Sequence, residues 1–224
     1  MNNTGTKYYK IPGFRCLTSE EIDLATPNGK VILINCSGNT PRQDQAANRD
    51  IYVNNVKSIE KLTSAFANRM HSVLHMSTSH LNFPEIRTEY TNAKKDSEDY
   101  LNQMASKHSF EVVNLRLPTI WSNKYLKDES LLHDITTAGL EGVMNLIRSP
   151  EAIIHIALEE SIGIQIRHFL ERNSEKADYD HSNSWTGSIT QLINLLQTEN
   201  LSSSYIENEL KRTYKYWRTG RPSS

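Results

Sequence analysis

A tyrosine and a lysine one helical turn apart, Tyr90 and Lys94, are the residues of this chain best suited by type and spacing to do chemistry. Side chains four residues apart share one face of a helix. An ammonium beside a phenol favours the phenolate and lowers the tyrosine pKa, so that the tyrosine can exchange protons with a hydroxyl or ketone near neutral pH. The spacing alone is a weak signal, because about one such pair is expected by chance in a chain with this tyrosine and lysine content. For the pair taken alone, a solvated helix face is the favoured explanation.

The elements around this pair alternate between strands and helices. Continuous apolar runs are typical of strands buried on both faces, and apolar residues at helical spacing predict the helices between them. We expect strands at 31–35, 72–76 and 110–117, and helices at 46–70 and 88–107. Such an alternation indicates right-handed crossovers and a parallel sheet.

Three hydroxyl residues, Ser77, Thr78 and Ser79, follow the second expected strand. The carboxyl end of a parallel strand is where such sheets place ligands, and a hydroxyl there can hydrogen-bond a reacting oxygen. Serine and threonine also end strands for structural reasons alone, so this signal is weak by itself. Glu98 continues the helix face of the tyrosine and the lysine and adds an acid at the same spacing.

The second half of the chain has a looser pattern. We expect helices at 131–147, 159–171, 189–196 and 205–217, a strand at 152–156 and a polar loop at 173–184. Too little sequence follows this loop for an independent domain. We therefore divide the chain into an N-terminal segment of unclear role (1–29), a catalytic half (30–125) and a small, mostly helical C-terminal lobe on the substrate side (126–224).

Composition and charge narrow the class of protein. The chain has 224 residues, of which 37% are hydrophobic and 23% charged, as in soluble globular proteins. The net charge of -1 argues against nucleic acid or an anionic membrane as the main partner. No apolar run is long enough to span a bilayer, and the first residues do not resemble a signal peptide. We expect a cytoplasmic protein.

The cysteines and histidines give no further site. Cys16 and Cys36 are too few for a secreted disulfide scaffold, and we interpret both as reduced packing residues. His71 and His75 flank the second strand, but no third ligand is evident in the sequence. We expect no metal site.

Five short segments in this order resemble the extended short-chain dehydrogenase/reductase family of sugar-nucleotide epimerases, dehydratases and reductases. The segments are VILINCSGNT (31–40), Asn54-Asn55-Val56, HMSTS (75–79), YTNAKKDSE (90–98) and NLRLPTIWS (114–122). Each is weak alone, and their order makes the resemblance specific over about 90 of the 224 residues. It implies an α/β Rossmann-like fold with a parallel sheet flanked by helices.

The resemblance also implies a role for each matching residue. Tyr90 would be the general acid/base, Lys94 would lower its pKa and hold the nicotinamide ribose, and Thr78 would hydrogen-bond the substrate oxygen. Ser79 or Ser77 is the alternative to Thr78. The residues implied to lie beside the cofactor are Ser37, Gly38, Asn55, Lys94 and Pro118. The implied cofactor is NAD or NADP, the substrate a nucleotide sugar, and the assembly a homodimer formed by the helices at 46–70 and 88–107.

The chain departs from the family in its first part. The family's Gly-x-x-Gly-x-x-Gly loop, which meets the pyrophosphate, does not occur in this sequence, and Trp121-Ser122 stands where tyrosine-glycine is usual. We expect a Rossmann-like fold truncated at its N-terminal half. The exposed edge of the strand at 31–35 would then be covered by residues 1–29, a second copy or a partner chain.

Two functions from different classes follow. The first is an NAD(P)-dependent sugar-nucleotide epimerase, dehydratase or reductase that uses a Tyr-Lys-Thr/Ser site. The second is a catalytically inactive protein of the same fold, or an interaction subunit, that does not bind a dinucleotide. The residues of the catalytic half favour the first function, and the missing glycine loop favours the second.

Overall fold

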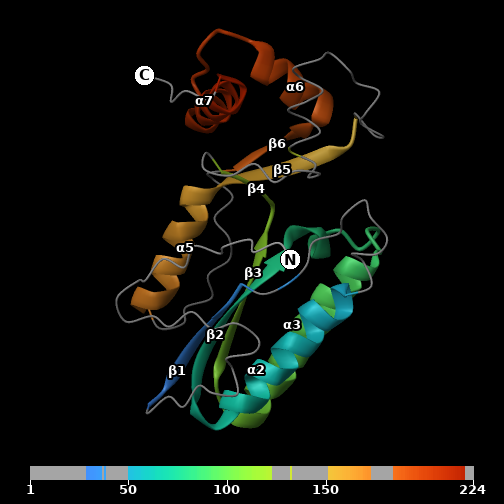
Figure 1. Cartoon of the computed structure of the whole chain (residues 1–224), viewed down its shortest axis with the longest axis vertical. Coiled ribbons are helices and arrows are strands. Elements are labelled where there is room, and N and C mark those ends of the chain that lie inside the picture. Colours follow the sequence, from blue (N-terminus) through green and yellow to red (C-terminus); the bar gives the residue numbers. More distant parts are fainter. Residues whose placement is uncertain are drawn as a thin grey trace, which may run out of the picture.

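The computed structural model describes residues 29–36, 38, 50–122, 132, 151–172 and 184–219, and the structural statements below concern these residues. They form two three-stranded sheets with helices packed against them (Figure 1). The expectations for the N-terminal segment up to residue 28, for Cys16 and Ser37, for the helix at 131–147 and for most of the polar loop at 173–184 lie outside the described residues.

The first sheet is parallel and has the order β1-β2-β3. Its strands are β1 (Val31–Asn35), β2 (Met70–Thr78) and β3 (Glu111–Leu117). In the register of the sheet, Asn35 lies opposite His75, and His75 opposite Asn114. The predicted α/β fold with a parallel, Rossmann-like sheet is thereby confirmed.

Two crossovers join these strands. The first contains a π-helical turn, η2 (Val53–Lys57), the helix α2 (Ser58–Phe66) and a 3-10 turn, η3 (Ala67–Arg69). The second contains a 3-10 turn, η4 (Ser79–Asn82), and the long helix α3 (Glu89–His108). The first crossover is thus less regular than the single helix expected at 46–70, and its last expected residue, Met70, already belongs to β2.

Helix α3 has well-defined ends. Thr88 and Thr91 form a capping box in which each side chain binds the other residue's backbone N–H, at 3.1 and 2.9 Å. At the other end, Ser109 adopts a left-handed conformation with φ of 57°, which stops the helix. Because the helix begins at a defined residue, Tyr90 and Lys94 lie in its first two turns.

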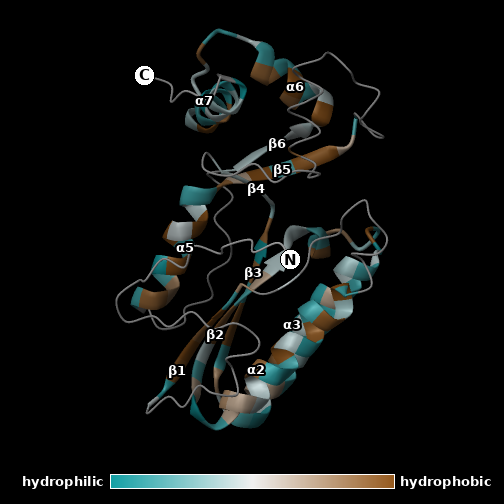
Figure 2. Cartoon of the chain, in the orientation of Figure 1, coloured by the Kyte–Doolittle hydropathy of each residue, from teal (hydrophilic) through white to brown (hydrophobic). Residues whose placement is uncertain are grey.

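Helices cover both faces of the parallel sheet. α2 and α3 lie on one face, and α5 (Glu159–Arg172) lies on the other (Figure 1). Val73 packs toward α2 and α3 and its neighbour Leu74 toward α5, and both are buried. Burial on both faces explains the adjacent apolar residues Val73 and Leu74 at the centre of β2. The edge strand β1 is apolar as well, and Figure 2 shows it coloured hydrophobic over most of its length, while its apolar side chains are only partly buried.

The second sheet is mixed and has the order β4-β5-β6. Its strands are β4 (Thr119–Trp121), β5 (Ile153–Leu158) and β6 (Ser184–Ser188), with β5 parallel to β4 and antiparallel to β6. α6 (Ile189–Gln197) and α7 (Tyr205–Thr219) pack against it. The core between them is built on four fully buried side chains, those of Trp121, Ile156, Leu192 and Leu210.

The second unit corresponds in part to the lobe expected at 126–224, whose described residues are mostly helical. It contains a sheet, and β4 comes from the part of the chain expected in the catalytic half. α5, expected in the lobe, packs on the parallel sheet through Ile162 and Phe169. Both elements therefore cross the division expected at residue 126.

β1 is the edge strand of the described part of the parallel sheet. It pairs with β2, and no other described strand lies on its far side. Ile32 of this strand is 40% exposed. What covers the edge stays a prediction. Within the described ranges, no helix combines the length and the apolar character needed to cross a membrane.

Candidate active site

The candidate site lies where the carboxyl ends of the three parallel strands meet the first turns of α3 (Figure 1). Thr78 is the last residue of β2, and Pro118, which is buried, follows β3. Cys36 and Gly38 follow β1. Parallel strands end at the same edge of a sheet, so the topology brings these residues together.

The Tyr90 hydroxyl interacts with the side chain of Thr78. Burial raises the pKa of Tyr90 above its ordinary value of 10.0, and the hydrogen bond with Thr78 opposes this rise. The expected lowering of the Tyr90 pKa is therefore not what the structure shows, because burial of the phenol outweighs the effects that favour the phenolate. Tyr90 in this environment is neutral at pH 7.

Lys94 is almost completely buried, with 5% of its surface exposed. Its Nζ donates a hydrogen bond of 2.9 Å to the carbonyl oxygen of Met76 on β2 and lies 6.0 Å from the centre of the Tyr90 ring. Burial lowers the Lys94 pKa to about 8, while Cys36 and Glu98 oppose the change. Most Lys94 side chains therefore keep their charge at pH 7.

Gly38 closes the site on the side of β1. Its φ is 145°, a conformation that favours glycine. A β-carbon at this position would lie 2.4 Å from Oδ1 of Asn55 and 3.0 Å from Nζ of Lys94. The backbone of Gly38 thus approaches two predicted cofactor-side residues more closely than any other residue type allows.

Asn55 connects the π-helical turn to α3. Its side-chain Nδ2 donates a hydrogen bond of 2.8 Å to the backbone carbonyl of Ile51. Its backbone carbonyl accepts a hydrogen bond of 2.8 Å from the hydroxyl of Ser97. All three of these residues are buried. A π-helical turn adds one residue to a helical turn, and here it directs Asn55 inward toward Lys94 and Gly38.

A polar pair lies beneath the lysine. Nδ2 of Asn35 donates a hydrogen bond of 2.8 Å to Nδ1 of His75, and both side chains are buried. Burial first, and the charge of Lys94 second, lower the His75 pKa to about 3. His75 is therefore a neutral core residue that accepts a hydrogen bond at Nδ1. Asn35 was not singled out from the sequence, although a polar residue ending an apolar strand is a usable signal.

The structure separates the three candidate hydroxyls. Thr78 contacts Tyr90, whereas the hydroxyl of Ser77 donates to Oε1 of Glu98 at 2.5 Å. Ser79 is buried as the first residue of η4. The predicted residues Thr78, Tyr90, Lys94, Gly38 and Asn55 thus come together, and Ser77 belongs to a neighbouring network.

Sequence reasoning did not single out the remaining members of that network. Arg116 binds Glu98 through two nitrogens and Asn82 through a third, at 3.0, 2.6 and 2.9 Å. Arg116 was part of a segment quoted for the family resemblance, but its partners are distant in sequence. Among the described residues there is no group of three or more potential metal ligands.

The fold and this site define an α/β protein with a Rossmann-like parallel sheet and a tyrosine, a lysine and a threonine at the carboxyl ends of its strands. No family model and no curated protein matches the sequence. Solved structures share the fold at 12–13% sequence identity, which is evidence of the fold alone.

Three of these solved structures are enzymes that act on nucleotide sugars. The UDP-glucuronic acid 4-epimerase from Bacillus cereus in complex with NAD has 13% identity and a TM-score of 0.62, with 83% of this chain and 72% of that chain covered. The UDP-N-acetylglucosamine 4-epimerase from Methanobrevibacter ruminantium has 13% identity and a TM-score of 0.63, with 90% of this chain and 80% of that chain covered. The dTDP-glucose 4,6-dehydratase from Bacillus anthracis in complex with NAD has 12% identity and a TM-score of 0.63, with 84% of this chain and 72% of that chain covered.

Proposed function

We propose that this protein is an NAD(P)-dependent enzyme that epimerises, dehydrates or reduces a nucleotide sugar. The observation that carries the proposal is the convergence of three side chains: the Lys94 ammonium lies 6.0 Å from the centre of the Tyr90 ring, and the Tyr90 hydroxyl interacts with the side chain of Thr78. A phenol, a hydroxyl and a cation in this arrangement are suited to proton exchange with a sugar hydroxyl or ketone.

Each residue has a distinct part in the proposed chemistry. Tyr90 donates its proton to, or accepts one from, the reacting oxygen. Thr78 hydrogen-bonds the same oxygen and orients it toward Tyr90. Lys94 stabilises the negative charge on the phenolate when Tyr90 gives up its proton. The burial of Lys94 keeps water away from its charge and strengthens that effect.

The residues present fit one end of a nicotinamide dinucleotide. The Lys94 ammonium has three donors and Met76 uses one, so the others suit the hydroxyls of the nicotinamide ribose. Gly38 allows a close approach beside it. Such a cofactor, when bound, supplies hydride transfer. The pyrophosphate end has no matching glycine-rich loop in this sequence.

That mismatch favours a second candidate function. A protein of this fold that does not bind a dinucleotide would serve as a catalytically inactive interaction subunit. The raised pKa of Tyr90 agrees with it as well, because a tyrosine that is neutral at pH 7 is a poor general base.

Calorimetric titration of the 224-residue chain with NAD(H) and NADP(H) separates the two candidates. We expect micromolar binding of one cofactor that Lys94→Ala weakens at least about tenfold, since a hydrogen bond to a charged group is lost. Tyr90→Phe should keep the binding and abolish turnover. Lys95→Ala, at the next and exposed position of α3, is the control and should bind as tightly as the unchanged chain.

No binding at millimolar cofactor would overturn the proposed enzyme and leave the interaction subunit. Binding that Lys94→Ala does not weaken would place the cofactor elsewhere and remove Lys94 from its proposed role.

A further inference from the structure

We propose that Arg116 is a positioning residue that keeps Thr78 and Tyr90 in contact, because its guanidinium binds both the helix that carries the tyrosine and the turn that follows the threonine. The inference rests on the proposed function only in the catalytic role that it gives to the Thr78–Tyr90 contact. The contact itself and its dependence on Arg116 can be measured without substrate or cofactor.

The first arm of this arrangement holds α3. Nε of Arg116 donates to Oε1 of Glu98 at 3.0 Å, and Nη2 donates to Oε2 at 2.6 Å. Glu98 lies two helical turns after Tyr90 and is 3% exposed. Its Oε1 also accepts the short hydrogen bond from Ser77 of β2. A two-point contact fixes the rotation of α3 against β2 and β3, because a guanidinium and a carboxylate match only in one plane.

The second arm holds the turn after β2. Nη1 of Arg116 donates to Oδ1 of Asn82 at 2.9 Å. Asn82 is the last residue of η4, whose N-cap is Thr78. Within the turn, the Thr78 hydroxyl is also the acceptor for the backbone N–H of His80, at 3.4 Å. One side chain from β3 thus anchors both the helix of Tyr90 and the turn of Thr78.

The chemistry of arginine accounts for this double contact. The guanidinium is planar and presents donors on two sides, so one edge can bind a carboxylate while another nitrogen binds an amide. A lysine carries a single ammonium with no such fork. Arg116→Lys therefore keeps the positive charge but cannot hold α3 and η4 at once.

Glu98 has a second effect, on the charge of the site. Its carboxylate favours the ammonium form of Lys94, as does Cys36 after β1, whereas burial disfavours that form. The Tyr90 phenol on the same helix also faces the ammonium. The neutral ring of His75 on β2 faces Lys94 as well. Arg116 on β3 acts on Lys94 indirectly, because it binds Glu98. Removal of the Arg116–Glu98 pair therefore changes both the position of α3 and the charge balance at Lys94.

Proton titration of Tyr90 by NMR of isotopically labelled tyrosine tests the proposal. The Tyr90 signal is assigned with Tyr90→Phe, and Thr78→Val defines the upward shift of the Tyr90 pKa that follows loss of the hydrogen bond. We expect Arg116→Lys and Asn82→Ala to shift the Tyr90 pKa in the same upward direction. Asp99→Asn, which breaks the exposed Lys95–Asp99 pair on the same helix, is the control and should cause no shift.

A Tyr90 pKa that stays unchanged in folded Arg116→Lys and in Asn82→Ala would overturn the proposal. Asn82 is exposed, so its substitution tests the turn even if Arg116→Lys fails to fold. In the active enzyme, Arg116→Lys should lower kcat about 100-fold, as expected for misplaced groups, and should weaken cofactor binding by much less. Equal losses in kcat and cofactor affinity would indicate general damage instead and would also overturn it.

Discussion

The ammonium nitrogen of Lys94 lies 6.0 Å from the centre of the Tyr90 ring, one turn further along α3. Its 2.9 Å hydrogen bond to the Met76 carbonyl ties it to β2, so the two side chains hold a defined geometry instead of a flexible surface pairing. This position explains both the burial of the lysine and its lowered pKa.

The buried Lys94 should make stability depend on alkaline pH. Its pKa is about 8 in the folded state and 10.5 ordinarily, so between these values the unfolded chain binds a proton that the native state lacks. The free energy of unfolding should rise there by up to about 1.4 kcal/mol per pH unit, and this gain is lost as pH falls through 8. Urea unfolding at several pH values should show the rise in the unchanged chain but not in Lys94→Met. Lys95→Met is the exposed control, and equal slopes in all three proteins would contradict the prediction.

The buried His75 should make the protein sensitive to acid. Its pKa falls from 6.5 to about 3 on folding. Between these pH values the unfolded chain therefore binds a proton at His75 that the native state does not bind. The free energy of unfolding should decrease as pH falls from 6.5 toward 3, by up to about 1.4 kcal/mol per unit. His75→Gln should remove this contribution, and His168→Gln on the exposed face of α5 should not. Parallel stability profiles for the unchanged chain and His75→Gln would argue against it.

Substitution of Gly38 should disturb the site more than substitution of another loop glycine. A β-carbon at Gly38 would press on Asn55 and Lys94 and would require an unfavourable φ, so we expect Gly38→Ala to cost roughly 1–3 kcal/mol of unfolding free energy. Gly29→Ala is the matched control, because nothing lies within 4 Å of a β-carbon there. Chemical unfolding of both variants checks the prediction, and an equal small effect would count against the close approach.

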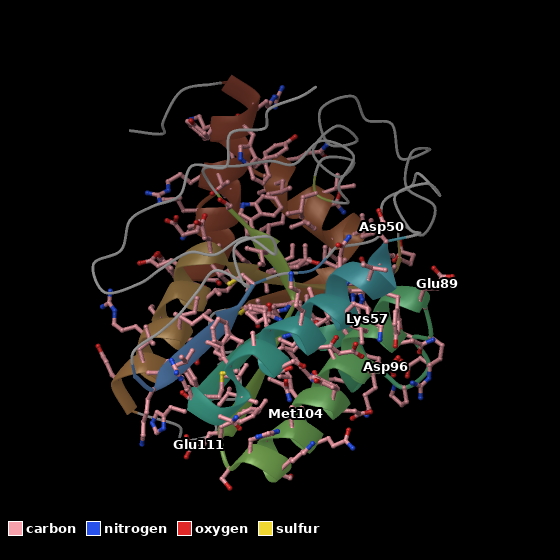
Figure 3. The ribbon with its side chains drawn as sticks, turned by 60° about the horizontal axis from the view of Figure 1, so that its bottom comes forward. Asp50, Lys57, Glu89, Asp96, Met104 and Glu111 are labelled. Carbon is pink, nitrogen blue, oxygen red and sulfur yellow. The ribbon has the colours of Figure 1, made fainter. Side chains whose placement is uncertain are left out.

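The predicted homodimer can be tested on the outer face of α2 and α3. Ile59 is fully buried against the sheet, so its substitution would test folding. Suitable positions lie on the exposed side of α3 and of the neighbouring turn η2, where Figure 3 shows Asp96 and Lys57, and where Val53 is 53% exposed. We expect Val53→Asp and Asp96→Arg to convert a dimer to a monomer in light-scattering measurements at equal concentration. Ile164→Asp on α5 is the control, and a dimer that survives the first two changes would place the interface elsewhere.

Much of the parallel unit could be predicted because its signals are local. The run at 31–35 is the strand β1, and the helix expected at 88–107 is α3 within one residue at each end. The expected strand at 152–156 and helix at 159–171 correspond to β5 and α5. Apolar runs and helical spacing predict the elements of a core, because strands covered on both faces favour apolar side chains.

Two strands were missed because nothing in their own sequence requires them. β4 has three residues, and β6 reads Ser-Trp-Thr-Gly-Ser. Both are strands because β5 lies between them and pairs with each. Pairing with a neighbour can override a weak local preference.

The sequence by itself determined the parallel α/β core and the residue types that end its strands, because burial and helix spacing are read along the chain. Only the tertiary structure decided which hydroxyl meets Tyr90, that Asn35 binds His75, and that Arg116 joins Glu98 to Asn82. These partners lie 12 to 40 residues apart and meet through strand register and helix rotation. The pKa values of Tyr90 and Lys94 were decided in the same way, because burial of a charge depends on every element packed around it.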